Sequence, residues 1–279
     1  MVPNDPLVSL CWYDLPEIRD ATDALWSAVR ERLAAAGLDD LPPALHRDET
    51  PEAIWRSGRL LLGQACGYDA IVAFSRELRI VATPCYDTPH TSGPEYRSLM
   101  LARADLPFES PDDLRGTRCV INNETSHSGM NVWQAVVAER HVGGRFFSEV
   151  KVSGSHVESL AALRSGEADV AAVDCITHRL LACERPAALV GTRILFQSEL
   201  APVPPFVTAA EASDELVDLL RGALRDVMTD PSLADVRRRL LLRGCEVLPR
   251  SAYEEIARID ARARALGYAE LAPSGDRPS

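Results

Sequence analysis

Short apolar runs alternate with amphipathic, helix-like stretches along most of this 279-residue chain. Such alternation is typical of α/β proteins, in which the helices that connect buried strands also cover them. Two proline-rich segments, near residues 84–94 and 199–205, interrupt the alternation. Because proline and glycine clusters favour loops over regular structure, we expect the chain to cross between two lobes there. The sequence therefore predicts one lobe from residues 1–88 plus 201–279, and an inserted second lobe from residues 89–200.

Three strand-like runs in the predicted second lobe, at residues 118–121, 149–152 and 170–174, are each followed by a helix-like stretch. The segment 84–94 is predicted to be a loop. From residue 214 to residue 266 the pattern predicts mostly helix.

Composition excludes several classes of protein. The formal net charge is −11, whereas a nucleic-acid-binding surface requires a basic stripe. Lys151 is the only lysine, so the chain lacks the Gly-Lys pair of a P-loop. No G-x-G-x-x-G motif follows a strand-like run, which argues against a dinucleotide-binding fold. The chain is long enough to bury a sizeable core, and we expect it to need no cofactor and no metal.

The first 20 residues contain neither a basic stretch nor an apolar run typical of a secretory signal peptide. No stretch approaches the roughly 20 apolar residues of a membrane span, so we expect a chain that is not inserted in a membrane. The seven cysteines are odd in number and scattered, which indicates thiols and not a disulfide framework. As printed, the sequence predicts a cytoplasmic protein, or a periplasmic one if a leader has been removed.

A polar turn with serine and histidine between a strand and a helix occurs twice in the predicted second lobe. The turns are NNETSHSG at 122–129 and SGSHVE at 153–158, and they contain Ser126, His127, Ser128 and His156. A helix start offers unpaired backbone N–H groups and the positive end of the helix dipole, which together favour an anion. The alternative is that the serines, including Ser155, only cap their helices.

Asp174 ends a buried strand-like run, at the edge where open α/β sheets bind ligands. Its alternative role is to cap the helix that follows. Tyrosines near predicted loops are candidates for an aromatic wall of the site, although one tyrosine is more often packing. Of these we single out Tyr13 and Tyr96, the second because it follows Gly93-Pro94 at the first crossing.

Two catalytic or metal interpretations receive little support from the residues. Cys175, His178 and Cys183 have a faint zinc-like spacing, but structural zinc sites usually show two close pairs of ligands. Serine, histidine and aspartate are all present without the G-x-S-x-G elbow of many hydrolases.

Five segments give the chain a resemblance to a known family: GPEYRS at 93–98, DLRG at 113–116, SHSG at 126–129, GSH at 154–156 and ALRSGEADVAAVD at 162–174. Over residues 8–250 the chain resembles the phosphate/phosphite/phosphonate-binding proteins of bacterial ABC importers, in the type II periplasmic-binding-protein superfamily. The resemblance implies an α/β fold of two lobes, with two interlobe crossings, that close on a ligand by hinge motion.

The resemblance also implies a site. In phosphonate binders a Ser-Thr-x-Gly turn and a later histidine hold the oxyanion, which matches Ser126, His127, Ser128 and His156. His127 departs from the pattern, because the family has a small hydroxyl residue there. The tyrosine at the crossing matches Tyr96, and the acid that meets the amine of an aminophosphonate matches Asp174.

The resulting hypothesis is a non-enzymatic solute-binding protein that recognises a small phosphonate- or phosphate-like anion in an interlobe cleft. Its expected ligand-binding residues are Tyr13, Tyr96, Ser126, His127, Ser128, His156 and Asp174, and the implied partner is an ABC importer permease. Two alternatives stay open. One is a cytoplasmic enzyme of cofactor biosynthesis on the same fold, and the other is a module that senses a ligand.

Overall fold

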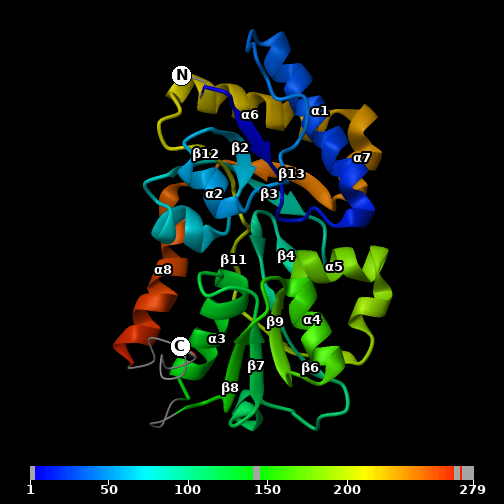
Figure 1. Cartoon of the computed structure of the whole chain (residues 1–279), viewed down its shortest axis with the longest axis vertical. Helices are drawn as coiled ribbons and strands as arrows, with labels where there is room; N and C mark the ends of the chain where they lie inside the picture. Colours follow the sequence, from blue (N-terminus) through cyan, green and yellow to red (C-terminus); the bar gives the residue numbers. More distant parts are fainter. Residues whose placement is uncertain (1–3, 141–144, 267–270, 272–279) are drawn as a thin grey trace. The chain divides into compact units, whose positions relative to one another are not determined.

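The computed structural model describes residues 4–140, 145–266 and 271. The chain divides into two compact units, each with its own sheet (Figure 1). Unit 1 contains the described residues up to Glu95 and Pro202–Tyr253. Unit 2 contains Tyr96–Ala201 and the described residues from Glu254 onward, whereas the sequence placed all of 201–279 in the first lobe. The short strands β4 (Thr91–Ser92), β5 (Glu95–Tyr96) and β11 (Ala201–Pro202) lie where the chain passes between units.

The unit 1 sheet has five strands in the order β1-β2-β12-β3-β13. They are β1 (Leu7–Ser9), β2 (Leu60–Gln64), β12 (Phe206–Ala209), β3 (Leu78–Tyr86) and β13 (Leu242–Glu246). The helices of this unit are α1 (Arg19–Ala35), α2 (Pro51–Arg56), α6 (Asp214–Thr229) and α7 (Ala234–Arg239). Shorter helical segments are η1 (Pro16–Ile18), η2 (Asp69–Ala73) and η6 (Pro231–Leu233). Helix α1 packs against α6 and against α7, and both α6 and α7 also contact β13.

Two details of unit 1 correct the sequence-based expectations. Strand β3 continues to Tyr86, into the segment predicted to be a loop. The region predicted to be mostly helical contains strand β13, which pairs antiparallel with β3. Leu241, at the end of α7, has a φ of 56°, which breaks the helix, and the longer β3 offers the free edge that β13 joins.

The unit 2 sheet has the order β10-β6-β9-β7-β8. Its strands are β10 (Thr192–Gln197), β6 (Ser98–Arg103), β9 (Val170–Asp174), β7 (Arg118–Ile121) and β8 (Glu149–Val152). Its helices are α3 (Val132–Ala138), α4 (His156–Ser165) and α5 (Cys175–Glu184), with shorter turns η3 (Pro111–Leu114), η4 (His127–Asn131) and η5 (Pro186–Leu189). Strands β8, β7 and β9 are mutually parallel, while β6 runs antiparallel to β9.

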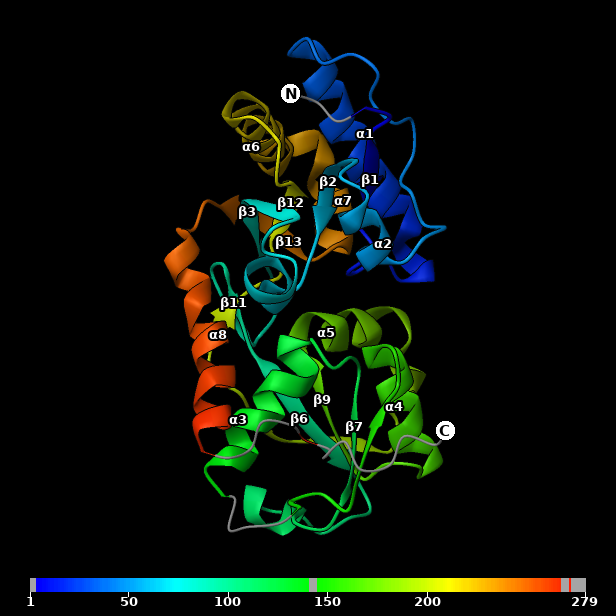
Figure 2. The same cartoon turned by 60° about the vertical axis from the view of Figure 1, so that its left-hand side comes forward.

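Successive side chains of the unit 2 strands point to opposite faces of the sheet, so the core of unit 2 lies on both faces. Val170 and Ala172 of β9 belong to a buried cluster with Trp133 of α3, and α4 packs against β9 and β7. Figure 2 shows β6, β9 and β7 side by side between α3 and α4. Helix α8 (Arg250–Ala265) begins in unit 1 and continues into unit 2, where Ala263 joins the same cluster. This packing explains why residues from Glu254 group with unit 2.

Candidate functional site

The candidate site lies at one edge of the unit 2 sheet, where three neighbouring parallel strands end. Strands β7, β8 and β9 have register pairs such as Val120 with Lys151 and Val120 with Ala171. Because parallel strands end at the same edge, the turns that follow them come together there. This relationship joins three segments that are far apart in the sequence: 122–129, 153–156 and Asp174.

The first turn is organised by Ser126. Its backbone is extended, and its Oγ accepts a hydrogen bond from the backbone N–H of Gly129 at 3.1 Å, so it caps η4. The Oγ of Ser128 lies 3.4 Å from the Oγ of Ser126. Both serines are buried. Ser126 therefore caps η4, which is one of the two roles that the sequence left open for it. Its hydroxyl also lies beside that of Ser128.

The second turn is held against the end of β7. Ser153 donates from its backbone N–H to the carbonyl oxygen of Ile121 at 2.8 Å, and Ser155 Oγ accepts from the backbone N–H of Glu158 at 3.1 Å. Ser155 thus caps α4, as predicted. His156 is the first residue of α4, and its Nε2 lies 2.9 Å from Ser128 Oγ. The two turns meet through this contact.

Asp174 is the last member of this group of side chains, and its two carboxylate oxygens have different partners. Oδ1 accepts hydrogen bonds from the backbone N–H groups of Ile176 and Thr177, at 3.0 and 2.8 Å, and so caps α5. Oδ2 lies 3.4 Å from His156 Nε2. In a hydrolase triad the serine and the acid contact different imidazole nitrogens. Here both contact Nε2, so this is not the geometry of such a triad.

Burial sets the charge of the two histidines. Removal from water lowers the pKa of His156, against the opposing effects of Asp174 and of the backbone carbonyl of Ala172. Burial also lowers the pKa of His127 to about 4. Both imidazoles are therefore neutral at pH 7 in the ligand-free chain. The buried hydroxyl groups of Ser126 and Ser128 and the neutral imidazole of His156 can donate hydrogen bonds to an anion without carrying an unpaired charge of their own.

His127 and Tyr96 form an adjoining pair, with ring centroids 6.3 Å apart and planes inclined by 59°. The amide of Asn131 donates from Nδ2 to Ile256 O at 3.0 Å, which fixes the orientation of this amide. The same Nδ2 lies 3.1 Å from His127 Nδ1, so Nδ1 is the acceptor and the imidazole proton sits on Nε2. The sequence reasoning missed Asn131, although its spacing of four residues from His127 was a usable signal.

Tyr13 belongs to unit 1, where its ring packs edge-on against Tyr86 with centroids 5.1 Å apart. Four of the seven predicted residues form the cluster, namely Ser126, Ser128, His156 and Asp174. Tyr96 and His127 adjoin one another in the same unit.

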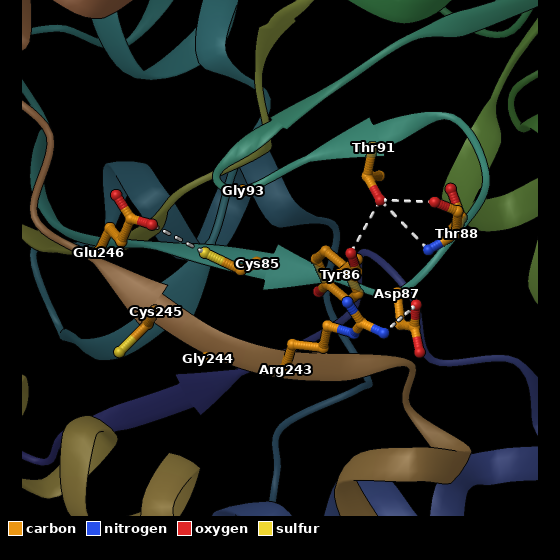
Figure 3. Close-up of a pocket in the computed structure, with 10 residues that line it drawn as sticks. All are labelled: Cys85, Tyr86, Asp87, Thr88, Thr91, Gly93, Arg243, Gly244, Cys245 and Glu246. Carbon is orange, nitrogen blue, oxygen red and sulfur yellow. Dashed lines mark hydrogen bonds and ion pairs between the residues drawn. The ribbon is translucent and has the colours of Figure 1, made fainter.

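A separate groove of about 370 Å³ lies within unit 1, beside the paired strands β3 and β13 (Figure 3). Asp87 and Arg243 form an ion pair at 3.0 Å in its wall, and Cys85 Sγ lies 3.7 Å from Glu246 Oε1. Burial, and then the Glu246 carboxylate, raise the pKa of Cys85 to about 12, so its thiol is not reactive. None of the seven predicted residues lines this groove.

Within residues 4–140, 145–266 and 271, no three His, Cys, Asp or Glu side chains lie close enough together to bind a metal ion. All seven cysteines are free thiols, with Cys66, Cys119 and Cys175 buried and Cys183 exposed. None of the helices in the described ranges is both long and apolar enough to span a membrane.

Comparison with known proteins places the chain, over most of its length, in a family. Residues 50–253 match the family model for the phosphonate-specific periplasmic substrate-binding protein of ABC transporters. The chain belongs to this family. Family members are periplasmic, and they are the components of ABC transporters that bind the substrate. No curated protein matches the chain in sequence.

Solved structures confirm the two-lobed α/β fold of type II periplasmic binding proteins. A binding protein component of an ABC phosphonate transporter from Pseudomonas aeruginosa has a TM-score of 0.76 at 17% identity, over 95% of this chain and 88% of that one. PhnD1 from Prochlorococcus marinus, in complex with methylphosphonate, has a TM-score of 0.74 at 15% identity, over 95% and 99%. XAC2383 from Xanthomonas citri, bound to chloride, has a TM-score of 0.71 at 15% identity, over 94% and 98%.

Proposed function

We propose that this chain binds a small phosphonate- or phosphate-like anion at the cluster of Ser126, Ser128, His156 and Asp174, and delivers it to the permease of an ABC importer. Family membership supports the transport role. The observation that carries the choice of site is the contact of Ser128 Oγ with His156 Nε2 at 2.9 Å. It brings the donors of two turns together at the edge of the sheet where α/β proteins bind ligands.

The chemistry of the cluster suits a tetrahedral oxyanion. Serine hydroxyls can reorient toward an anion, and an imidazole N–H can donate to a second oxygen. Each hydrogen bond to a charged oxygen contributes on the order of 1.5–3 kcal/mol. A bound anion also stabilises the protonated form of His156, so a proton can accompany the ligand into the site.

Asp174 restricts which anions fit. Its Oδ1 is occupied by two backbone N–H groups, while Oδ2 remains beside His156. A carboxylate oxygen this close repels a dianion, and it attracts either a protonated phosphonate oxygen or a ligand ammonium group. The proposed ligand is therefore a monoprotonated phosphonate, or one that carries an amine.

Calorimetric titration and thermal unfolding of the purified chain test the proposal. The probes are methylphosphonate, 2-aminoethylphosphonate, phosphite and phosphate, with acetate and sulfate as comparison anions. We expect saturable binding without consumption of the ligand. At 100 times the dissociation constant the ligand should stabilise the chain by about 2.7 kcal/mol. Absence of binding by all four phosphorus oxyanions would overturn the proposal, and steady turnover of one of them would favour the enzyme alternative.

The proposed place of action follows the family, whose members are periplasmic. We expect the native protein on the outer side of the cytoplasmic membrane, the second of the two locations that the sequence left open. Cell fractionation with an antibody to the chain distinguishes the two.

A further inference from the structure

Asn122 lies between the two turns of the candidate site, directly after β7. Its carbonyl oxygen accepts a hydrogen bond from the backbone N–H of Gly154 at 2.9 Å. Its neighbour Ile121 accepts in the same way from Ser153. Asn122 is thus the point where the first turn leaves the sheet and where the second turn is attached to it.

The side chain of Asn122 lies over Gly129 in the first turn. A Cβ at position 129 would stand 1.7 Å from Asn122 Oδ1 and 2.9 Å from its Cγ, which no real structure tolerates. A side chain at position 129 would therefore force the Asn122 amide to move, and glycine leaves the room that this close approach needs. The amide group is held against the same turn whose hydroxyls, Ser126 and Ser128, belong to the cluster.

The amide of Asn122 makes no hydrogen bond in the part of the chain that the structure describes. Its Oδ1 is buried against Gly129 and has no partner. A C–H group beside a carbonyl oxygen is a weak donor, which favours placing Oδ1 there and leaves Nδ2 as the outer atom. A half-buried amide without partners is unfavourable unless something else supplies the hydrogen bonds.

We propose that Asn122 contacts the bound anion through its amide Nδ2, and that it is a further residue determining the specificity of this site. The inference rests on the proposed function, because it takes the anion to be bound by the two turns that Asn122 joins. An amide donor is neutral, so it adds a hydrogen bond without changing the charge of the pocket. It therefore favours a ligand that presents an oxygen acceptor at this position over one that presents a donor.

Three variants and one matched control test the inference, with affinities for methylphosphonate and phosphate measured by calorimetry. Asn122→Ala removes the donor and should weaken binding by about tenfold. Asn122→Asp keeps the shape but replaces the donor with a charged acceptor, and should weaken binding by about 100-fold or more. The control is Asn123→Asp. Asn123 Oδ1 already accepts from the N–H and the hydroxyl of Thr125, a role that aspartate keeps, so we expect less than a threefold change.

The third variant checks the packing independently of any ligand. Gly129→Ala should lower the unfolding temperature of the otherwise wild-type chain. The loss should be smaller when it is combined with Asn122→Ala, because the Oδ1 atom that the new Cβ would meet is then absent. Unchanged affinity in Asn122→Ala overturns the inference. Equal losses in Asn122→Asp and Asn123→Asp also overturn it, since they show an effect of charge at a distance. If the wild-type chain binds none of the anions, the proposed function itself fails, and the inference fails with it.

Discussion

His156 and Ser128 are 28 residues apart in the chain, yet His156 Nε2 lies 2.9 Å from Ser128 Oγ. Each residue stands at the start of a helical segment, and each segment follows one strand of the adjacent parallel pair β8 and β7. The contact therefore depends on the register of the sheet. Each residue is a contact of the other, beside Ser126 for Ser128 and Asp174 for His156.

Removal of either partner should weaken anion binding. We expect Ser128→Ala to lower the affinity for methylphosphonate by about tenfold and His156→Ala by about 10–100-fold, since each loses a hydrogen bond to a charged oxygen. Calorimetric titration measures both. Ser165→Ala and His46→Ala, which alter an exposed serine and a histidine near the surface, are the controls and should bind as the wild type does. Wild-type affinity in both site variants would show that the anion binds elsewhere.

Substitution of Asp174 by asparagine should change which ligand is preferred. Asparagine keeps an oxygen that can accept from Ile176 and Thr177, so the cap of α5 is retained while the negative charge is lost. We expect tighter binding of methylphosphonate and weaker binding of 2-aminoethylphosphonate, which changes the ratio of their dissociation constants by about tenfold or more. Asp113→Asn removes a charge from another capping aspartate and should leave the ratio unchanged. An unaltered ratio in Asp174→Asn would mean that Oδ2 does not face the ligand.

Burial of His127 should make the stability of the ligand-free chain depend on pH. Its pKa is about 4 in the folded chain, below the ordinary 6.5, so the unfolded chain binds the proton more tightly. The free energy of unfolding should therefore be highest above pH 6.5 and fall by about 3 kcal/mol from this residue as the pH drops to about 4. Urea unfolding across this range measures the loss. His127→Gln should make the profile shallower, and a profile that keeps the wild-type slope would contradict the assignment.

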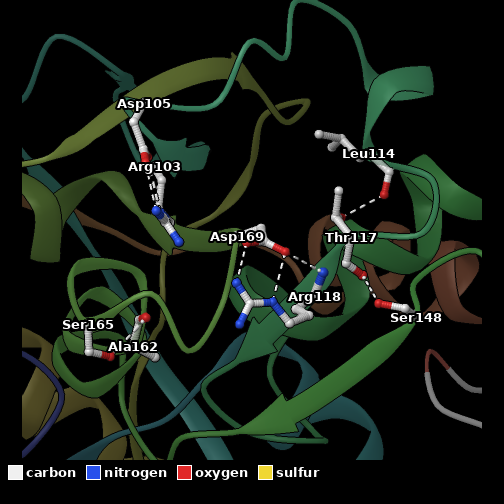
Figure 4. Close-up of polar contacts among 9 residues, drawn as sticks. All are labelled: Arg103, Asp105, Leu114, Thr117, Arg118, Ser148, Ala162, Ser165 and Asp169. Carbon is white, nitrogen blue, oxygen red and sulfur yellow. Dashed lines mark hydrogen bonds and ion pairs between the residues drawn. The ribbon is translucent and has the colours of Figure 1, made fainter.

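A bidentate ion pair joins the N-terminal ends of β7 and β9. Arg118 donates from Nε and Nη2 to the Asp169 carboxylate at 3.1 and 2.6 Å, and its backbone N–H adds a bond at 2.9 Å (Figure 4). Lysine cannot make the paired contact, so Arg118→Lys should lower the free energy of unfolding. Arg103→Lys alters a more local pair with Asp105 and should cost less. Anion affinity should stay within twofold of the wild type, because the site is at the opposite ends of these strands, and a larger loss would show that the pair also shapes the site.

Local patterns predicted the second unit well. The three strands at 118–121, 149–152 and 170–174 are found at these residues, because each is a short run that contains valine and is bounded by polar turns. The caps at Ser155 and Asp174 were also predictable, since a capping side chain bonds to N–H groups within three residues of itself. Strand β13 was not, because residues 242–246 owe their extended form to pairing with β3, more than 150 residues earlier.

The sequence by itself determined the α/β class, the strand–turn–helix units of unit 2 and the residue types that can bind an anion, because these depend on neighbours within a few positions. Only the tertiary structure decided that His156 contacts both Ser128 and Asp174 through one nitrogen, that Asn131 fixes the tautomer of His127 and that Asn122 lies over Gly129. Such contacts depend on the order and register of the strands. Order and register arise from packing between distant segments, and no repeating pattern of residues in the sequence reveals them.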